Sequence, residues 1–128
     1  IDKIADRLPP AQIDGPPTGD VLIVGWGGTY GALRQAAHQL RAEGHAVGHL
    51  HLRYLNPLQS NVGALLARYR RVVVAELNLG QLRSILRDKF LVDARGLNKI
   101  QGKPFKVREV VEAVRKLLPV PASRELHA

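Results

Sequence analysis

Hydrophobic positions along the chain form short apolar runs and longer amphipathic stretches, and the two kinds alternate. The runs at 21–24 and 72–75 are bounded by polar residues or glycine, which is typical of strands buried on both faces of a sheet. The segment 46–52 is predicted to form another strand. A short last strand is expected at 97–101, after a turn at 95–96.

The amphipathic stretches predict four helices, each with one apolar face. The first covers 30–43, with Thr29 as its N-cap and Gly44 directly after its end. The second begins after Ser60 or Asn61, and Pro119 ends the last. The four apolar faces are expected to consist of Leu33, Ala36, Ala37 and Leu40; of Val62, Leu65, Leu66 and Tyr69; of Leu82, Ile85, Leu86 and Phe90; and of Val107, Val110, Val111, Val114, Leu117 and Leu118.

This alternation of strands and helices predicts a three-layer α/β/α domain over 20–119, with a mostly parallel sheet and right-handed crossovers. Residues 1–19 are expected to be a linker from a missing preceding domain, because their four prolines and Gly15 oppose both helix and strand. Residues 120–128 are expected to be a flexible tail. Since the chain begins with Ile, we expect it to be a fragment of a longer protein.

The composition excludes several kinds of site. The chain contains no cysteine, so it cannot form a disulfide, a thiolate metal site or a cysteine-ligated iron–sulfur cluster. No apolar run approaches the roughly 20 residues that a membrane-spanning helix needs. The first residues do not have the charged start and apolar stretch of a signal peptide. We therefore expect a cytoplasmic protein that does not contact a membrane.

The formal net charge of +8 is concentrated in the second half of the chain. The segment 83–116 contains ten Lys or Arg and only four Asp or Glu. Such a surface attracts nucleic acids, phosphorylated cofactors or acidic proteins. Aromatic residues make up only 5% of the chain, which argues against a stacking platform for single-stranded nucleic acid. We expect no nucleic-acid partner.

The glycine-rich segment 25–31 (GWGGTYG) follows the first predicted strand and precedes a helix. Glycines allow close approach of the backbone to a ligand, and a helix N-terminus attracts anions. The spacing G-x-G-x-x-x-G differs by one residue from the dinucleotide fingerprint, and no Walker lysine follows. Three interpretations remain open, namely a tight turn in which Gly31 packs under the sheet, a phosphate-binding loop, and an interface formed by Trp26.

A second polar loop follows the strand at 72–75. Glu76 ends that strand, and Asn78, Gly80 and Gln81 come directly afterwards. A carboxylate at such a place could act as a general base, but no neighbour in the sequence completes a catalytic set. We predict no catalytic residue in this domain. The remaining interpretations are that Glu76 and Asn78 tie the loop to neighbouring backbone, or that they contact a partner subunit.

His49 and His51 alternate on one face of the strand predicted at 46–52, where two imidazoles could approach one metal ion. No carboxylate or third histidine stands at a recognisable metal-ligand spacing. We therefore predict no metal site and interpret the pair as packing or as a polar strand face. His38 and His45 are expected at the surface.

Four motifs occur in order over residues 20–118, at 25–31 (GWGGTYG), 51–58 (HLRYLNPL), 76–82 (ELNLGQL) and 102–105 (GKPF). Together they resemble the G-W-G-x-T-x-G, H-L-R-x-L-x-P, E-x-N-x-G-Q-L and G-x-P-F segments of one family. That family is the C-terminal domain of the alpha subunit of 2-oxoglutarate and other 2-oxoacid:ferredoxin oxidoreductases. The fuller motifs and the Arg- and Ala-rich composition resemble its actinobacterial members.

The resemblance implies a fold like the C-terminal domain of transketolase and a place in a larger enzyme. That enzyme decarboxylates a 2-oxoacid oxidatively, transfers the acyl group to coenzyme A and reduces ferredoxin. Thiamine diphosphate, magnesium and an iron–sulfur cluster would lie mostly with the beta subunit, and none would be bound by this domain alone. The implied partners are the beta subunit and the rest of the alpha chain, with ferredoxin and coenzyme A binding to the complex. The isolated domain is expected to be inactive.

Two hypotheses follow for this domain. It is either an assembly and interface module or a phosphate- or coenzyme-binding regulatory module that uses residues 27–29 and the basic half of the chain. The candidate ligand or interface residues are Trp26, Gly27, Gly28, Thr29, Tyr30, Glu76, Asn78 and Gln81.

Overall fold

The computed structural model describes residues 8–53, 59–76, 81–90, 94–98 and 105–119. The strands are β1 (Ile13–Asp14), β2 (Gly19–Trp26), β3 (Val47–Leu52), β4 (Tyr69–Glu76) and β5 (Ala94–Asn98). The helices are η1 (Gly27–Thr29, a 3-10 turn), α2 (Tyr30–Ala42), α3 (Val62–Leu66), α4 (Gln81–Phe90) and α5 (Val107–Arg115). None of the helices in the described ranges is long and apolar enough to cross a membrane.

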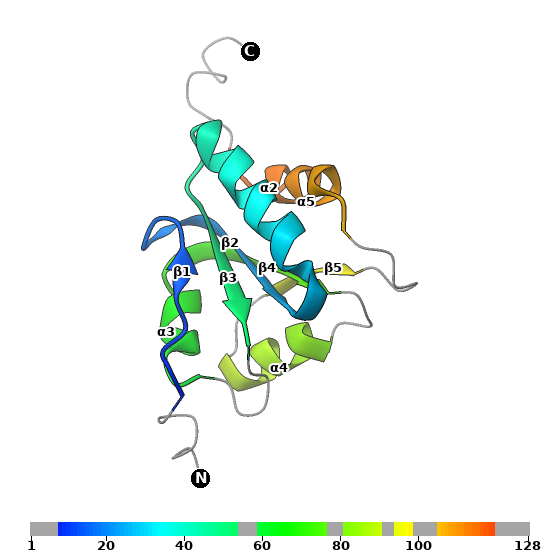
Figure 1. The fold of residues 1–128 in the computed structure, drawn as a ribbon. Coiled ribbons are helices and arrows are strands. Elements are labelled where there is room, and N and C mark those ends of the chain that lie inside the picture. The colour runs from blue at the N-terminus through cyan, green and yellow to red at the C-terminus, as the bar shows by residue number, and fades with distance from the viewer. Residues whose placement is uncertain (1–7, 54–58, 77–80, 91–93, 99–104, 120–128) are drawn as a thin grey trace.

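The five strands form one sheet in the order β1-β3-β2-β4-β5. Strands β3, β2, β4 and β5 are parallel, and only the two-residue β1 is antiparallel to its neighbour β3. Helices α2 and α5 cover one face of the sheet, and α3 and α4 cover the other (Figure 1). This arrangement confirms the predicted three-layer α/β/α fold with a mostly parallel sheet.

Each face of the sheet has its own hydrophobic core, because successive strand residues point to opposite faces. Val21 and Ile23 of β2 pack with α2 and α5, whereas Leu22 and Val24 pack with α3 and α4. All four are fully buried, which explains why β2 appears in the sequence as a continuous apolar run. The predicted α2 face, Leu33, Ala36, Ala37 and Leu40, is also fully buried.

Several local predictions are wrong in detail. Tyr69 does not lie on a helix face but begins β4, because α3 ends at Leu66. The last strand comprises Ala94–Asn98, so Arg95 and Gly96 pair with β4 instead of forming a turn. In both cases the pairing of a neighbouring strand overrides a short local pattern. The prediction for residues 99–101 lies outside the described residues.

The helix stop predicted at Gly44 is confirmed. Gly44 has a φ of +95°, a left-handed conformation that glycine adopts without steric cost. Thr29 occupies the N-cap position of α2, but its side chain makes no capping hydrogen bond. Its hydroxyl instead donates to the carbonyl of Trp26, 3.2 Å away, inside the turn that precedes the helix.

The prediction that no strand forms within residues 1–19 is wrong. Residues 8–18, which we call the arm, lie along the edge of β3, with Ile13 paired to Leu50 and Asp14 to His49. The Asn61 amide donates to the Ala11 carbonyl and accepts from the Ala11 N–H, both at 2.8 Å. Two such bonds compensate for the ladder bonds that prolines cannot make. Whether residues 1–19 also connect to a preceding domain stays a prediction.

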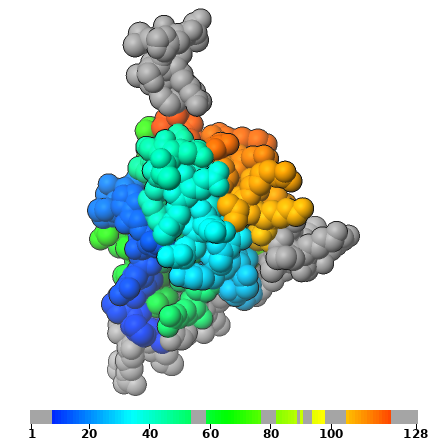
Figure 2. Space-filling view, turned by 45° about the horizontal axis from the view of Figure 1, so that its top comes forward, coloured from blue at the N-terminus to red at the C-terminus, as the bar shows by residue number. Residues whose placement is uncertain are grey.

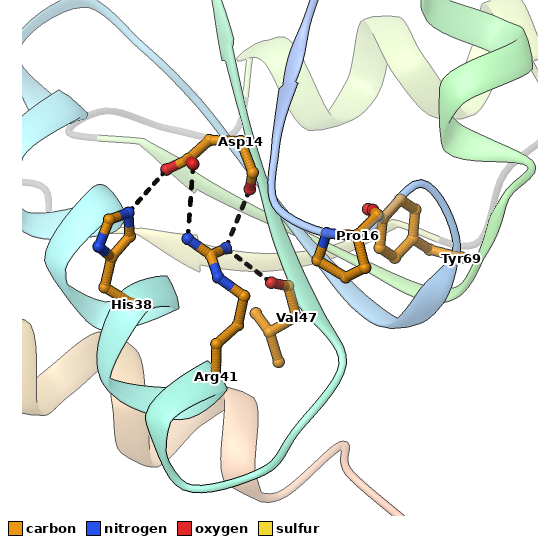
Figure 3. A network of polar contacts seen from close by, with 6 residues as sticks. All are labelled: Asp14, Pro16, His38, Arg41, Val47 and Tyr69. Atoms are coloured by element: carbon orange, nitrogen blue, oxygen red, sulfur yellow. Dashed lines mark hydrogen bonds and ion pairs between the residues drawn. The ribbon is translucent and has the colours of Figure 1, made fainter.

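Polar side chains hold the second part of the arm (Figure 3). Arg41 of α2 donates to the carbonyls of Asp14 and Val47, at 3.0 and 2.9 Å, and so joins the arm to β3. The Asp14 carboxylate forms ion pairs with His38, at 3.0 Å, and with Arg41, at 3.5 Å. Tyr69 donates its hydroxyl to the carbonyl of Pro16. The arm is therefore a packed part of the domain.

Candidate functional site

The carboxyl ends of β2, β3 and β4 lie at one edge of the sheet, where open α/β folds bind their ligands. The glycine-rich loop follows β2, and the loop that begins after Glu76 follows β4. Strands β2 and β4 are direct neighbours, with Gly25 paired to Ala75. The next residue on each strand, Trp26 and Glu76, extends this register. The strand ends that precede the two candidate loops are therefore adjacent in space.

Glu76 is 1% exposed, and its carboxylate accepts three hydrogen bonds. Two come from the backbone N–H groups of Leu82, at 2.8 Å, and Arg83, at 3.1 Å, in the first turn of α4. The first N–H groups of a helix have no partner within the helix, and a carboxylate there also interacts favourably with the helix dipole. Glu76 therefore fixes the start of α4 to the end of β4.

The third hydrogen bond to Glu76 comes from Trp26, whose indole Nε1 donates to Oε1 over 3.1 Å. The Trp26 ring is partly buried against the core on the side of α3 and α4. A single carboxylate thus connects the end of β2, the end of β4 and the start of α4.

The four glycines at 25, 27, 28 and 31 have different environments. A Cβ on Gly25 would lie 2.2 Å from Leu33 Cδ1 and 2.6 Å from Thr29 Oγ1, so helix and strand approach most closely there. Gly27 has a φ of +67°, and Cβ atoms on Gly28 and Gly31 would meet nothing within 4 Å. The prediction that Gly31 packs under the sheet is wrong, because that place is taken by Gly25. Gly27 and Gly28 present an exposed surface.

Tyr30 points to the opposite face of the sheet from Trp26. It is 49% exposed, and its ring lies 5.6 Å from the ring of His49 and 5.1 Å from that of His51. His49 itself is 2% exposed, and His51 is partly buried. Burial lowers the pKa of His49 to about 4, with a further contribution from His51. Burial, and then the charge of Arg53, also lowers the pKa of His51.

The structure places the other candidates only in part. Asn78 lies outside the described residues. The backbone of Gln81 begins α4, directly before the N–H groups that Glu76 binds, while its side chain lies outside the described part. Thr29 is buried in the turn. The structure thus brings together Trp26 and Glu76, and separates both from Tyr30.

The described contacts at this edge join β2, β4 and α4. Within the described ranges, no group of three or more His, Asp or Glu is placed to bind a metal ion. The one candidate carboxylate, Glu76, is buried and already accepts three hydrogen bonds. The bond between Trp26 and Glu76 spans 50 residues, and no local pattern in the sequence indicates it.

Sequence reasoning also missed a cavity of about 400 Å³ beside the arm. Its walls include Tyr30, His49, His51, Arg53 and Gln59, together with residues 9–14. The alternation of His49 and His51 was the only local signal of it. The opposite wall is the arm, which the prolines had indicated to be a linker.

Relatives of known identity resemble most of this chain. Over 123 aligned residues it is 44% identical to the 2-oxoglutarate oxidoreductase subunit KorA of Mycobacterium tuberculosis. Over 121 residues it is 34% identical to subunit alpha of 2-oxoacid:ferredoxin oxidoreductase 1 of Aeropyrum pernix. Each alignment covers 88% of this chain but 19% of the relative. The chain thus spans about a fifth of the length of these relatives.

Solved structures show the same fold. The 2-oxoglutarate:ferredoxin oxidoreductase of Magnetococcus marinus, solved with 2-oxoglutarate, coenzyme A and succinyl-CoA bound, matches 90% of this chain and 21% of its own. The TM-score is 0.83 and the sequence identity 28%. A split-gene transketolase in an inactive β4 tetramer matches 88% of this chain and 43% of its own, with a TM-score of 0.64 and 26% identity. The resemblance to transketolase is therefore confirmed at the level of the fold.

The family model for core domain II of pyruvate:ferredoxin oxidoreductase matches residues 19–110. This range runs from the first residue of β2 into α5 and includes both loops at the carboxyl edge. It covers well over half of the chain. The chain belongs to the family of pyruvate:ferredoxin oxidoreductase core domain II.

Proposed function

We propose that this chain is the C-terminal assembly domain of the alpha subunit of a 2-oxoacid:ferredoxin oxidoreductase, with 2-oxoglutarate as the 2-oxoacid. The observation that carries the proposal is the buried contact between Trp26, Glu76 and the start of α4. The carboxylate at this edge joins the ends of two strands to the start of a helix, which supports a structural role for Glu76. The 44% identity to a 2-oxoglutarate oxidoreductase subunit supports the choice of 2-oxoacid.

The parent complex would oxidatively decarboxylate 2-oxoglutarate in the cytoplasm, transfer the succinyl group to coenzyme A and pass the electrons to ferredoxin. Thiamine diphosphate, magnesium and an iron–sulfur cluster would be held mostly by the beta subunit. This chain has no cysteine for cluster ligation and, in its described part, no metal-ligand cluster. Its contribution would be to hold the beta subunit and the rest of the alpha chain in position.

The surface that would contact the partner is the exposed glycine turn. Gly27 and Gly28 are exposed, and the turn begins directly after Trp26, whose side chain is bonded to Glu76. A rigid surface loses little conformational entropy when a partner binds. Since an added Cβ at Gly28 meets nothing within 4 Å, a side chain there changes the surface and leaves the fold intact.

A substitution at Gly28 therefore allows a direct test of assembly. The variant Gly28→Asp places a charged side chain on the proposed contact surface, and we expect it to weaken binding of the beta subunit by about tenfold or more. Gly44→Asn, after the far end of α2, is the control, because asparagine tolerates positive φ and the position is also open. The measurement is the dissociation constant of the alpha and beta subunits. Equal affinity of Gly28→Asp and wild type would contradict the assembly proposal.

A second test addresses the absence of catalysis in this domain. The 128-residue chain alone should not reduce viologen with 2-oxoglutarate and coenzyme A, whereas the reconstituted complex should. The chain should also show no saturable binding of coenzyme A or thiamine diphosphate. If it bound either one, and if Gly28→Asp abolished that binding, the domain would instead be a coenzyme-binding module.

A further inference from the structure

The cavity beside the arm lies on the opposite face of the sheet from the bond between Trp26 and Glu76. It is bounded by the arm, by the carboxyl end of β3 and by Tyr30 at the start of α2. In Figure 2 the arm, in dark blue, lies beside α2, in cyan. A volume of about 400 Å³ falls within the range of cavities that hold small molecules.

Unsatisfied polar atoms gather around this cavity. Among the described residues, four buried side-chain nitrogen or oxygen atoms have no hydrogen-bond partner. Three of them, His49 Nε2, His51 Nδ1 and Gln59 Oε1, belong to side chains that line the cavity. A buried polar atom without a partner costs about 1–3 kcal/mol, and such atoms are rare in native proteins. The three side chains therefore leave polar groups unpaired beside the cavity, although these three atoms are themselves closed to solvent.

The chemistry of the lining favours an anion. Arg53 contributes a positive charge, Tyr30 a hydroxyl, and the two histidines imidazole N–H groups, all of which donate hydrogen bonds. Among the described residues of the wall, the one carboxylate is that of Asp14, and it is already paired with His38 and Arg41. The charge of Asp14 is therefore neutralised, while Arg53 and Tyr30 are exposed. The described residues offer no third ligand of the kind that would favour a metal ion at the histidine pair.

We propose that the cavity between the arm, Tyr30, His51 and Arg53 binds a small anion through a carboxylate or phosphoryl group. His49 and Gln59 line the same cavity and would bind the polar remainder of the ligand. Arg41 joins the arm to β3, and Asn61 joins the arm to the segment that precedes α3, so the cavity is already formed without ligand. This site is separate from the assembly surface and does not depend on that function.

Binding should be linked to pH. His49 faces His51, Asp14, Arg41 and His38, and His51 faces Arg53. Burial lowers the pKa of both imidazoles. His51, Arg41 and His38 lower the pKa of His49 further, and Arg53 lowers the pKa of His51 further. A bound anion favours the protonated imidazole and raises its pKa, so binding takes up protons. Affinity should therefore increase as the pH falls from about 8 to about 6.

The experiment uses the intact protein, purified as the cell assembles it, with inorganic phosphate and malonate as probes and uncharged malonamide as a control. Isothermal titration calorimetry should show saturable binding of at least one anion, but not of malonamide. Arg53→Gln and His51→Gln should each weaken this binding about tenfold or more, and His51→Gln should also reduce its pH dependence. Tyr30→Phe keeps the ring and removes only the hydroxyl. Arg87→Gln, an exposed cation on α4, is the matched control and should leave affinity unchanged.

The place at which the anion binds is tested independently of its affinity. Phosphate or malonate should protect His51 from carbethoxylation by diethyl pyrocarbonate, as read by peptide mass spectrometry. Two outcomes would overturn the proposal. The first is binding that Arg53→Gln and His51→Gln do not affect. The second is binding by the separated 128-residue chain but not by the intact protein, which would mean that a side chain of the assembled protein fills the cavity. Arg53 is exposed, so its replacement does not disturb folding.

Discussion

At the scale of single residues, the most consequential side chain is Glu76. It is buried at the end of a strand in an otherwise apolar core, and it remains satisfied because an indole and two backbone N–H groups donate to it. Burying a charge without such partners would be strongly unfavourable. The same contacts connect β2, β4 and α4, so the residue stabilises the arrangement of three elements.

Replacing Glu76 by Gln should destabilise the chain by about 2 kcal/mol, since hydrogen bonds to a charged group contribute about 1.5–3 kcal/mol and the amide NH₂ would face another donor. Urea unfolding measures the change. Glu112→Gln, on the exposed side of α5, is the control. A double-mutant cycle with Trp26→Phe should give a coupling energy above about 0.5 kcal/mol. Strict additivity would mean that the bond between the two residues contributes nothing.

At the scale of elements, two close contacts determine how the segments pack. One is the approach of α2 to β2 at Gly25, and the other is the attachment of the arm to the segment that precedes α3. Both depend on residues that are ordinary in the sequence. A glycine in a glycine-rich segment and an asparagine near a helix start are both common. Only the tertiary contacts show that Gly25 allows α2 to approach β2 and that Asn61 binds the arm.

Gly25→Ala should lower the free energy of unfolding by about 1–3 kcal/mol, because its Cβ would overlap Leu33 and Thr29. Gly31→Ala, in the first turn of α2, should be neutral or stabilising by up to about 1 kcal/mol, since alanine favours helix and the position is open. Thermal unfolding of both variants separates the two roles. Equal melting temperatures would show that close packing at Gly25 does not matter.

Asn61→Ala should release the arm. The variant removes both hydrogen bonds to Ala11 and leaves a backbone N–H and a carbonyl without partners. Hydrogen exchange over residues 8–16 should become faster by about tenfold or more, which corresponds to about 1–2 kcal/mol, while exchange in β2 and β4 changes less. Ser60→Ala, at the exposed neighbouring position, is the control. Unchanged protection of the arm would contradict this account.

At the scale of the whole molecule, the two faces of the sheet differ in chemistry. On one face, Trp26 and Glu76 close the edge with a fully bonded contact. On the other face, Tyr30 and the two histidines border a cavity. The residues of the proposed assembly surface and of the proposed anion site can therefore be changed independently of each other, although both sites begin at one glycine-rich turn.

Global stability should fall as the pH is lowered from about 6.5 towards 4. The unfolded chain protonates His49 near pH 6.5, whereas burial keeps the pKa in the folded chain at about 4. Between these values the unfolded state binds more protons, so acid favours unfolding, by on the order of 3 kcal/mol in total. The lowered pKa of His51 acts in the same direction. Urea midpoints at several pH values measure the slope.

The variant His49→Gln tests which group causes this dependence of stability on pH, because the glutamine side chain carries no charge at any pH in the range. Its stability should depend less on pH between about 6.5 and 4 than that of the wild type. His45→Gln, at a partly buried position after α2, controls for the loss of a histidine elsewhere. An identical slope in wild type and His49→Gln would show that His49 is not the group responsible.

The sequence by itself determined the layers of this protein. Continuous apolar runs at β2 and β4, and helical spacing in α2, follow from burial on two faces and on one face, and both patterns are local. The four motifs also indicated the family. Short elements were predicted less well, and β5 and the start of β4 were misplaced, because their positions depend on strand pairing.

Tertiary structure alone decided how the candidate residues combine. The bonds from Trp26 to Glu76 and from Asn61 to Ala11 each span 50 residues, and strand register sets the first of them. The cavity also depends on tertiary structure, because its walls come from the arm, β3 and α2. Hydrophobic spacing indicates which face of an element is buried. It does not indicate which polar groups meet when distant elements pack, because that depends on the alignment of whole strands.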